Sequence, residues 1–228
     1  MFKVSNLSKS FTLHHQEKTQ INVLRGISFK VKKGECVALT GPSGAGKSTL
    51  MRMLYGNYLA TNGSIKIDSL ELVGAEPQQI LDIRRHHIGY VSQFLQVLPR
   101  VSALRVVAEP LIAAGRTSND AKARAAEILT QLRIPEALWT LSPLTFSGGE
   151  QQRVNIARGF SHHYPAMLLD EPTASLDPEN RQTVLDLIHE AKTRDTAIIG
   201  IFHDQAARDA VCDSEIEINA LQQQAVVS

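Results

Sequence analysis

The residues best suited to chemistry lie between Gly41 and Thr49. This stretch fits the pattern G-x-x-x-x-G-K-[ST], in which glycines let successive backbone N–H groups approach a polyphosphate closely. Lys47 can reach the β- and γ-phosphates, and the Ser48 hydroxyl can ligate Mg²⁺. The predicted phosphate-binding residues are Gly41, Pro42, Ser43, Gly44, Ala45, Gly46, Lys47, Ser48 and Thr49.

A strand and a helix must position this loop. Cys36–Leu39 is an apolar run typical of a buried strand, and residues 48–55 have the pattern of a helix. The N-terminus of that helix would add its positive end to the phosphate site. Strand, loop and helix in this order are the context that the motif requires.

Two carboxylates end a second apolar strand that begins at Ala166. Asp170 at the strand end can hold Mg²⁺ through water, and Glu171 can polarise an attacking water as a general base. Adjacent side chains point to opposite sides of a strand, so the two carboxylates can take different roles only because the strand ends there.

Two more strands are predicted to deliver polar side chains to the same place. Gln93 follows the strand at 88–91, and its amide oxygen could ligate Mg²⁺ or hold a water. A third apolar strand, at 197–202, ends at His203. Ligands bind beyond the carboxyl ends of the strands in α/β sheets, so these strand ends predict one site.

Two further features have two interpretations each. Ser147, Gly148 and Gly149 open a predicted helix, where they form either a second anion site or a simple N-cap. Phe11 lies near the start of the chain, where it either stacks on a purine ring or lies at the rim of a sheet.

The composition is that of one large globular domain with room for an inserted subdomain. The chain has 228 residues, of which 43% are hydrophobic and 21% charged, and its net charge of +1 neither favours nor excludes nucleic acid. Its apolar runs are too short to span a bilayer. The two cysteines, Cys36 and Cys212, favour a reducing cytosol over a structural disulfide, so we expect a cytoplasmic protein.

The remaining pattern divides the chain into a strand-rich and a helix-rich part. Residues 1–33 predict antiparallel strands, with a hairpin tip at 14–18, and residues 99–163 predict helices. Within the second part, Ser118–Asp120 is predicted to cap a helix that Pro135 ends. Its buried face would carry Ala121, Ala125, Ile128, Leu129 and Leu132.

This set of motifs is similar to that of ATP-binding cassette (ABC) ATPases, and the similarity covers nearly the whole chain. It rests on residues 41–49, Gln93, Phe146–Glu150, Leu168–Glu171, Ser175–Asp177 and His203. The resemblance implies an α/β P-loop NTPase fold with a mixed sheet core, an N-terminal antiparallel β subdomain and an inserted helical subdomain. Residues 1–228 would form one domain, with its core at 1–92 and 164–228 and the helical subdomain at 93–163.

The resemblance also implies an activity. We expect Mg²⁺-dependent ATP hydrolysis in a head-to-tail dimer of two ABC subunits, identical or different. Each ATP would lie between one chain's phosphate loop and the other chain's Ser147, Gly148 and Gly149. Glu171 would position the water, His203 would contact the γ-phosphate, and Asp177 would signal across the dimer. The expected cofactors are ATP and Mg²⁺.

A narrower resemblance points to the PhnL-type ABC subunits of the bacterial carbon–phosphorus lyase system. It rests on residues 93–104, 146–160 and 198–204. It implies a role in phosphonate breakdown, in the step that joins an alkylphosphonate to a ribosyl triphosphate. The expected partners are then lyase subunits, with no nucleic acid.

The alternative is the cytoplasmic ATPase subunit of an ABC membrane transporter. Its permease would be gripped by the Gln93–Phe94 region and the helices that follow. Phe146 and Glu150 stand where transport cassettes usually have Leu and Gln, which leaves the coupling partner open. A third class, the ABC ATPases of DNA repair or translation, fits least. Repair members carry a long coiled coil that the sequence lacks, and translation members usually carry two cassettes.

Overall fold

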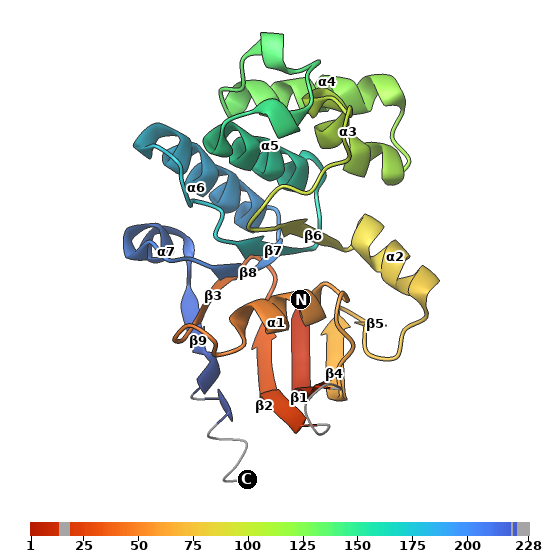
Figure 1. The fold of residues 1–228 in the computed structure, drawn as a ribbon, viewed down its shortest axis with the longest axis vertical. Helices are drawn as coiled ribbons and strands as arrows, with labels where there is room; N and C mark the ends of the chain where they lie inside the picture. Colours follow the sequence, from red (N-terminus) through yellow and green to blue (C-terminus); the bar gives the residue numbers. More distant parts are fainter. Residues whose placement is uncertain (14–18, 220, 223–228) are drawn as a thin grey trace.

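The computed structural model describes residues 1–13, 19–219 and 221–222. Figure 1 shows a central sheet with a layer of helices on one side and a second, smaller sheet on the other. The predicted hairpin tip at 14–18 lies outside the described residues. Among those that are described, no helix is long and apolar enough to cross a membrane.

The smaller sheet is antiparallel, as residues 1–33 predict. Its strand order is β2-β1-β4-β5. In β1, Phe2 and Val4 are buried while Lys3 between them is exposed, the alternation of a sheet with one solvated face. The strands are β1 (Phe2–Leu13), β2 (Thr19–Val31), β4 (Asn62–Ile67) and β5 (Leu70–Glu71).

The central sheet is parallel, with the strand order β6-β7-β8-β3-β9. Every residue of β7 and β8 is buried, which explains why both strands read as continuous apolar runs. The bounds are β6 (Ile88–Val91), β7 (Ala166–Asp170), β8 (Ala197–Ile201), β3 (Cys36–Thr40) and β9 (Ser214–Glu217).

Two hydrophobic cores lie on opposite faces of the central sheet. Ala38 and Leu169 pack with the helical layer, whereas their neighbours Val37 and Leu168 pack with the smaller sheet. Successive side chains of a strand point to opposite faces, so each apolar strand serves both cores. The helices are α1 (Lys47–Leu54), α2 (Pro77–His86), α3 (Ala103–Ala113), α4 (Ser118–Gln131), α5 (Gly148–Ser161), α6 (Pro178–Thr193) and α7 (Gln205–Val211).

The ends of α4 differ from the prediction. Its N-cap is Thr117, whose Oγ1 accepts a hydrogen bond from the Asp120 N–H at 3.2 Å, and Ser118 is already helical. The helix ends at Gln131, before Pro135, because Arg133 takes a left-handed backbone conformation with φ 54°. The predicted apolar face is buried as expected.

Helix α5 approaches β6 very closely. A Cβ atom added to Gly159 would lie 2.4 Å from Val91 Cγ2, a distance that real Cβ atoms do not tolerate, and Val91 is fully buried. Gly159 therefore lets the helix that begins beside Ser147 lie directly on the strand that leads to Gln93.

We predict that Gly159→Ala lowers the free energy of unfolding by about 1–2 kcal/mol, because overpacking outweighs the better helix propensity of alanine. Denaturant unfolding measures the change. In a Val91→Ala background the clashing methyl is absent, so Gly159→Ala should become stabilising. A destabilisation of the same size in both backgrounds would contradict the packing argument.

Candidate active site

The phosphate loop joins β3 to α1. Gly46 is the N-cap of α1 and has φ 99°, and an added Cβ would lie 2.7 Å from Leu24 Cδ2 on β2. The position therefore needs glycine both for its backbone conformation and for the close approach of β2. In the described part of the chain no side chain caps Gly46. The first turn of α1 thus keeps its N–H groups free for an anion.

Lys47 folds back over the start of this loop. Its Nζ donates hydrogen bonds to the carbonyl oxygens of Gly41, at 2.6 Å, and Pro42, at 3.0 Å. The ammonium thus sits at the loop, while Ser43 and Gly44 are exposed. Its predicted role on the β- and γ-phosphates stays a prediction.

Three strand ends bring Gln93, Glu171 and His203 together. Glu171 Oε1 lies 2.9 Å from His203 Nε2, and Gln93 Nε2 donates to the same oxygen at 3.4 Å. The side chain of Glu171 is 20% exposed and that of His203 is 70% exposed. A carboxylate that is partly shielded and hydrogen-bonded on one oxygen can still accept a proton from a water.

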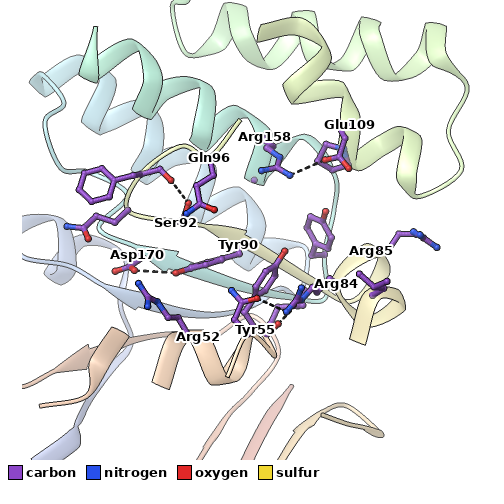
Figure 2. A pocket seen from close by; sticks show the side chains of 18 of the residues that line it. Arg52, Tyr55, Arg84, Arg85, Tyr90, Ser92, Gln96, Glu109, Arg158 and Asp170 are labelled. Atoms are coloured by element: carbon purple, nitrogen blue, oxygen red, sulfur yellow. Dashed lines mark hydrogen bonds and ion pairs between the residues drawn. The ribbon is translucent and has the colours of Figure 1, made fainter. Parts of the chain in front are cut away.

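Backbone conformation separates the two carboxylates. Glu171 has φ 55°, in the left-handed region that a non-glycine residue seldom occupies, and such strain gathers at functional sites. Asp170 instead is the last residue of β7, and its Oδ2 accepts a hydrogen bond from Tyr90 OH at 3.3 Å (Figure 2). Burial raises the pKa of Asp170, an effect that this hydrogen bond opposes.

The three predicted Mg²⁺ ligands line one cavity of about 870 Å³. They are Ser48 at the start of α1, Gln93 after β6 and Asp170 at the end of β7. A hydroxyl, an amide oxygen and a carboxylate are oxygen donors of the kind that Mg²⁺ binds, often through retained waters. The donor set therefore fits the ion.

Ser147 is the N-cap of α5, and Glu150 completes a capping box. Ser147 Oγ donates to Glu150 Oε2 at 2.7 Å, and the Ser147 N–H donates to the same oxygen at 2.9 Å. The hydrogen bond from Ser147 lowers the pKa of Glu150. The N-cap interpretation is thus correct. Ser147 and Gly148 are exposed, so another chain could reach them. The anion site at this helix start stays a prediction.

Asp177 and Phe11 both have local structural partners. Asp177 is the N-cap of α6, and hydrogen bonds from Asn180, first from its backbone N–H at 2.9 Å, lower the pKa of Asp177. Phe11 is half-buried, with its ring edge-to-face to Tyr58 and the Lys9 ammonium 4.7 Å from its centroid. Signalling by Asp177 and purine stacking by Phe11 stay predictions.

Sequence reasoning missed two buried amides on α5. Asn155 Nδ2 donates to the Ser92 carbonyl at 2.5 Å, and Gln152 Nε2 donates to the Glu171 carbonyl at 3.4 Å. Gln152 and Asn155 are three residues apart and therefore lie on one helix face. Two polar residues at this spacing among apolar neighbours are the sequence signal that could have found them. Sequence reasoning also missed Tyr90, because its hydrogen bond to Asp170 depends on how β6 pairs with β7.

Known proteins resemble this chain over most of its length. A family model described as ABC transporter matches residues 24–174. The lipoprotein-releasing system ATP-binding protein LolD of Legionella pneumophila (strain Paris) is 36% identical over 198 residues, which cover 86% of this chain and 87% of LolD. The macrolide export ATP-binding/permease protein MacB of Mannheimia succiniciproducens is 37% identical over 185 residues, 81% of this chain and 29% of MacB.

Solved structures confirm the predicted fold. A dimeric structure of the ATP-binding cassette MJ0796, in a post-hydrolysis state bound to ADP and Pi, has a TM-score of 0.87 and 29% identity. The match covers 96% of this chain and 94% of that chain.

The same comparisons do not support the predicted role in phosphonate breakdown or carbon–phosphorus lyase partners. The relatives described above are named for lipoprotein release and macrolide export. The resemblance to PhnL-type subunits rests on residues 93–104, 146–160 and 198–204, and these stretches contain the general motif residues Gln93, Ser147 and His203. Such residues cannot separate one subgroup from another.

We predict that Glu171→Gln keeps ATP binding and slows hydrolysis by roughly 10²- to 10⁴-fold, because the amide keeps the shape of the side chain but cannot accept a proton. Phosphate release and calorimetric ATP binding measure the two effects. Glu127→Gln, an exposed change on α4, is the control and should leave both unchanged. Normal turnover of Glu171→Gln would remove the proposed role.

We predict that Tyr90→Phe raises the Mg²⁺ concentration for half-maximal ATP hydrolysis roughly 10-fold, since the group that orients Asp170 is lost. Magnesium titrations at saturating ATP measure the shift. Tyr55→Phe is the matched control, because its ring packs 4.9 Å from that of Tyr90, while the hydroxyl that donates to Asp170 is that of Tyr90. Equal Mg²⁺ dependence in all three proteins would show that Tyr90 only packs.

Proposed function

Because this chain belongs to the ABC transporter family of ATP-binding cassettes, we propose that it is the ATPase subunit of a membrane transporter. As a member of the family it binds ATP with Mg²⁺ and hydrolyses ATP. The observation that carries the transporter assignment is the similarity to LolD over 87% of LolD's length. The match to the ATP-binding/permease protein MacB supports the same class.

The working unit in this proposal is a head-to-tail dimer with a second ABC subunit, identical or different. Residues 1–92 and 164–228 form the nucleotide-binding core, and residues 93–163 form the inserted helical subdomain. Each ATP lies between the phosphate loop of one subunit and residues 147–149 of the other. The exposure of Ser147 and Gly148 and the dimeric structures of MJ0796 support this arrangement.

The membrane subunit docks beside Gln93 in this proposal. Phe94 is 73% exposed and Leu81, on α2, is 49% exposed, and both line the 870 Å³ cavity that extends along β6. Large apolar side chains exposed next to a cavity are typical of protein contact surfaces. Figure 2 shows the basic side chains of the same cavity, which are Arg52, Arg84, Arg85 and Arg158.

A membrane subunit bound at Phe94 would be coupled to the nucleotide site, because Phe94 is adjacent in sequence to Gln93. Phe94 follows Gln93, whose side chain is hydrogen-bonded to Glu171. Asn155, on α5, donates a hydrogen bond to the carbonyl of Ser92, the residue before Gln93. A membrane subunit that prefers one arrangement of this segment would therefore bind one nucleotide state more tightly, and ATP turnover would move it between the two.

The test uses Glu171→Gln as bait in detergent-solubilised membranes with MgATP. We expect recovery of an integral membrane protein, at least several-fold weaker with Phe94→Ser or Leu81→Ser added. Leu141→Ser is the matched control, because Leu141 is 48% exposed but does not line the cavity, and it should leave recovery unchanged.

Other results would redirect the proposal. Recovery of lyase subunits in place of a membrane protein would restore the phosphonate assignment. Loss of the membrane protein with Leu141→Ser as much as with Phe94→Ser would place the contact elsewhere on the chain.

A further inference from the structure

The two cysteines of the chain face each other. Cys36 Sγ lies 3.7 Å from Cys212 Sγ, although 176 positions separate them. Cys36 is the first residue of β3, and Cys212 lies between α7 and β9. The pair lies at the amino end of β3, away from the phosphate loop, so neither cysteine belongs to the site described above.

Two hydrogen bonds between Cys36 and Asp213, the neighbour of Cys212, hold the two segments together. The Asp213 N–H donates to the Cys36 carbonyl at 2.8 Å, and the Cys36 N–H donates to Asp213 Oδ2 at 2.8 Å. One residue further along, Val37 pairs with Ser214 in the β3–β9 ladder. A disulfide needs its sulfurs at about 2.05 Å, so the bond requires the two Sγ atoms to approach by about 1.6 Å.

The two thiols differ in reactivity. Cys36 is fully buried, and the hydrogen bond to Cys212 together with burial raises the pKa of its thiol. The same hydrogen bond lowers the pKa of Cys212, as do the nearby Lys192 and Arg208, while burial and the Asp213 carboxylate act against them. Lys192 is held there by hydrogen bonds to Val211 O and Asp213 Oδ1. Cys212 is half-buried whereas Cys36 is fully buried, so Cys212 is the thiol that an oxidant reaches first.

We propose that Cys36 and Cys212 are a reversible redox pair that closes an intramolecular disulfide on oxidation by a peroxide. The Cys212 thiolate attacks one peroxide oxygen, the O–O bond breaks, and hydroxide leaves and is protonated to water. The resulting sulfenic acid is attacked by the Cys36 sulfur, the S–S bond forms, and the hydroxyl leaves with the Cys36 proton as a second water. Two thiols thus lose two electrons and two protons, and a dithiol reductant reverses the step.

The bond would tie two elements that lead to the phosphate site. Cys36 begins the strand that ends at Thr40, directly before Gly41, and Cys212 ends the segment that follows His203 through α7. Because the closed loop is long, the cross-link should limit the unfolded chain strongly and raise the unfolding temperature. This inference is independent of the transporter proposal, since it needs no partner and no nucleotide.

The test treats the full-length protein with a small excess of hydrogen peroxide. We expect both free thiols to disappear, the intact mass to fall by two hydrogens, and non-reducing peptide mapping to find Cys36 joined to Cys212. The unfolding temperature should rise on the order of 5–10 °C, and dithiothreitol should reverse every change.

Single variants separate the two roles. In Cys36→Ala, Cys212 should form a sulfenic acid that dimedone traps, with no rise in unfolding temperature; Cys36→Ser repeats the test if alanine disturbs packing. In Cys212→Ala, the buried Cys36 should stay a thiol. Cross-linked dimers, an irreversible Cys212 sulfinic acid in the parent protein, or two thiols that survive peroxide would each overturn the proposal.

Discussion

The hydrogen-bond ladder of the parallel sheet is the constraint on which the rest of the structure depends. Its register places Val91, Leu169, Gly200 and Ala38 in one row across β6, β7, β8 and β3. Two or three residues beyond this row, the four strands reach Gln93, Glu171, His203 and Gly41. Segments far apart in sequence thus meet at one edge because their backbones pair, and this placement does not depend on specific side-chain contacts.

Helix α5 links two of these strand ends to each other through hydrogen bonds. It starts at the exposed Ser147, and its buried amides reach the carbonyls of Ser92 and Glu171. At its far end Gly159 lets the helix rest on β6. A displacement of the exposed start would therefore be transmitted to both the Gln93 segment and the Glu171 turn, through hydrogen bonds that are worth more when shielded from water.

Periodicity predicted the central strands well, because apolar runs such as β7 and β8 are buried on both faces and leave few alternatives. The resemblance to ABC ATPases supplied the arrangement of the subdomains. The sequence pattern placed the cap of α4 at Ser118–Asp120, whereas the cap is Thr117, because serine and threonine side chains can both accept the bond. The contacts of Tyr90, Gln152 and Asn155 depend on how distant segments pack, which local patterns do not contain. The phosphonate assignment found no support, because the stretches it rested on surround general motif residues and the relatives are named for lipoprotein release and macrolide export.

The position of β3 between β8 and β9 has a consequence for biosynthesis. Strand β3 is made early, yet its neighbours Ala197–Ile201 and Ser214–Glu217 emerge from the ribosome more than 150 residues later. At ordinary translation rates the nascent Cys36–Thr40 segment waits roughly 10–30 s for its partners. During that interval an apolar strand with two open edges is a target for aggregation, so chaperone binding to the nascent amino-terminal third should decide how much of this protein reaches its native state.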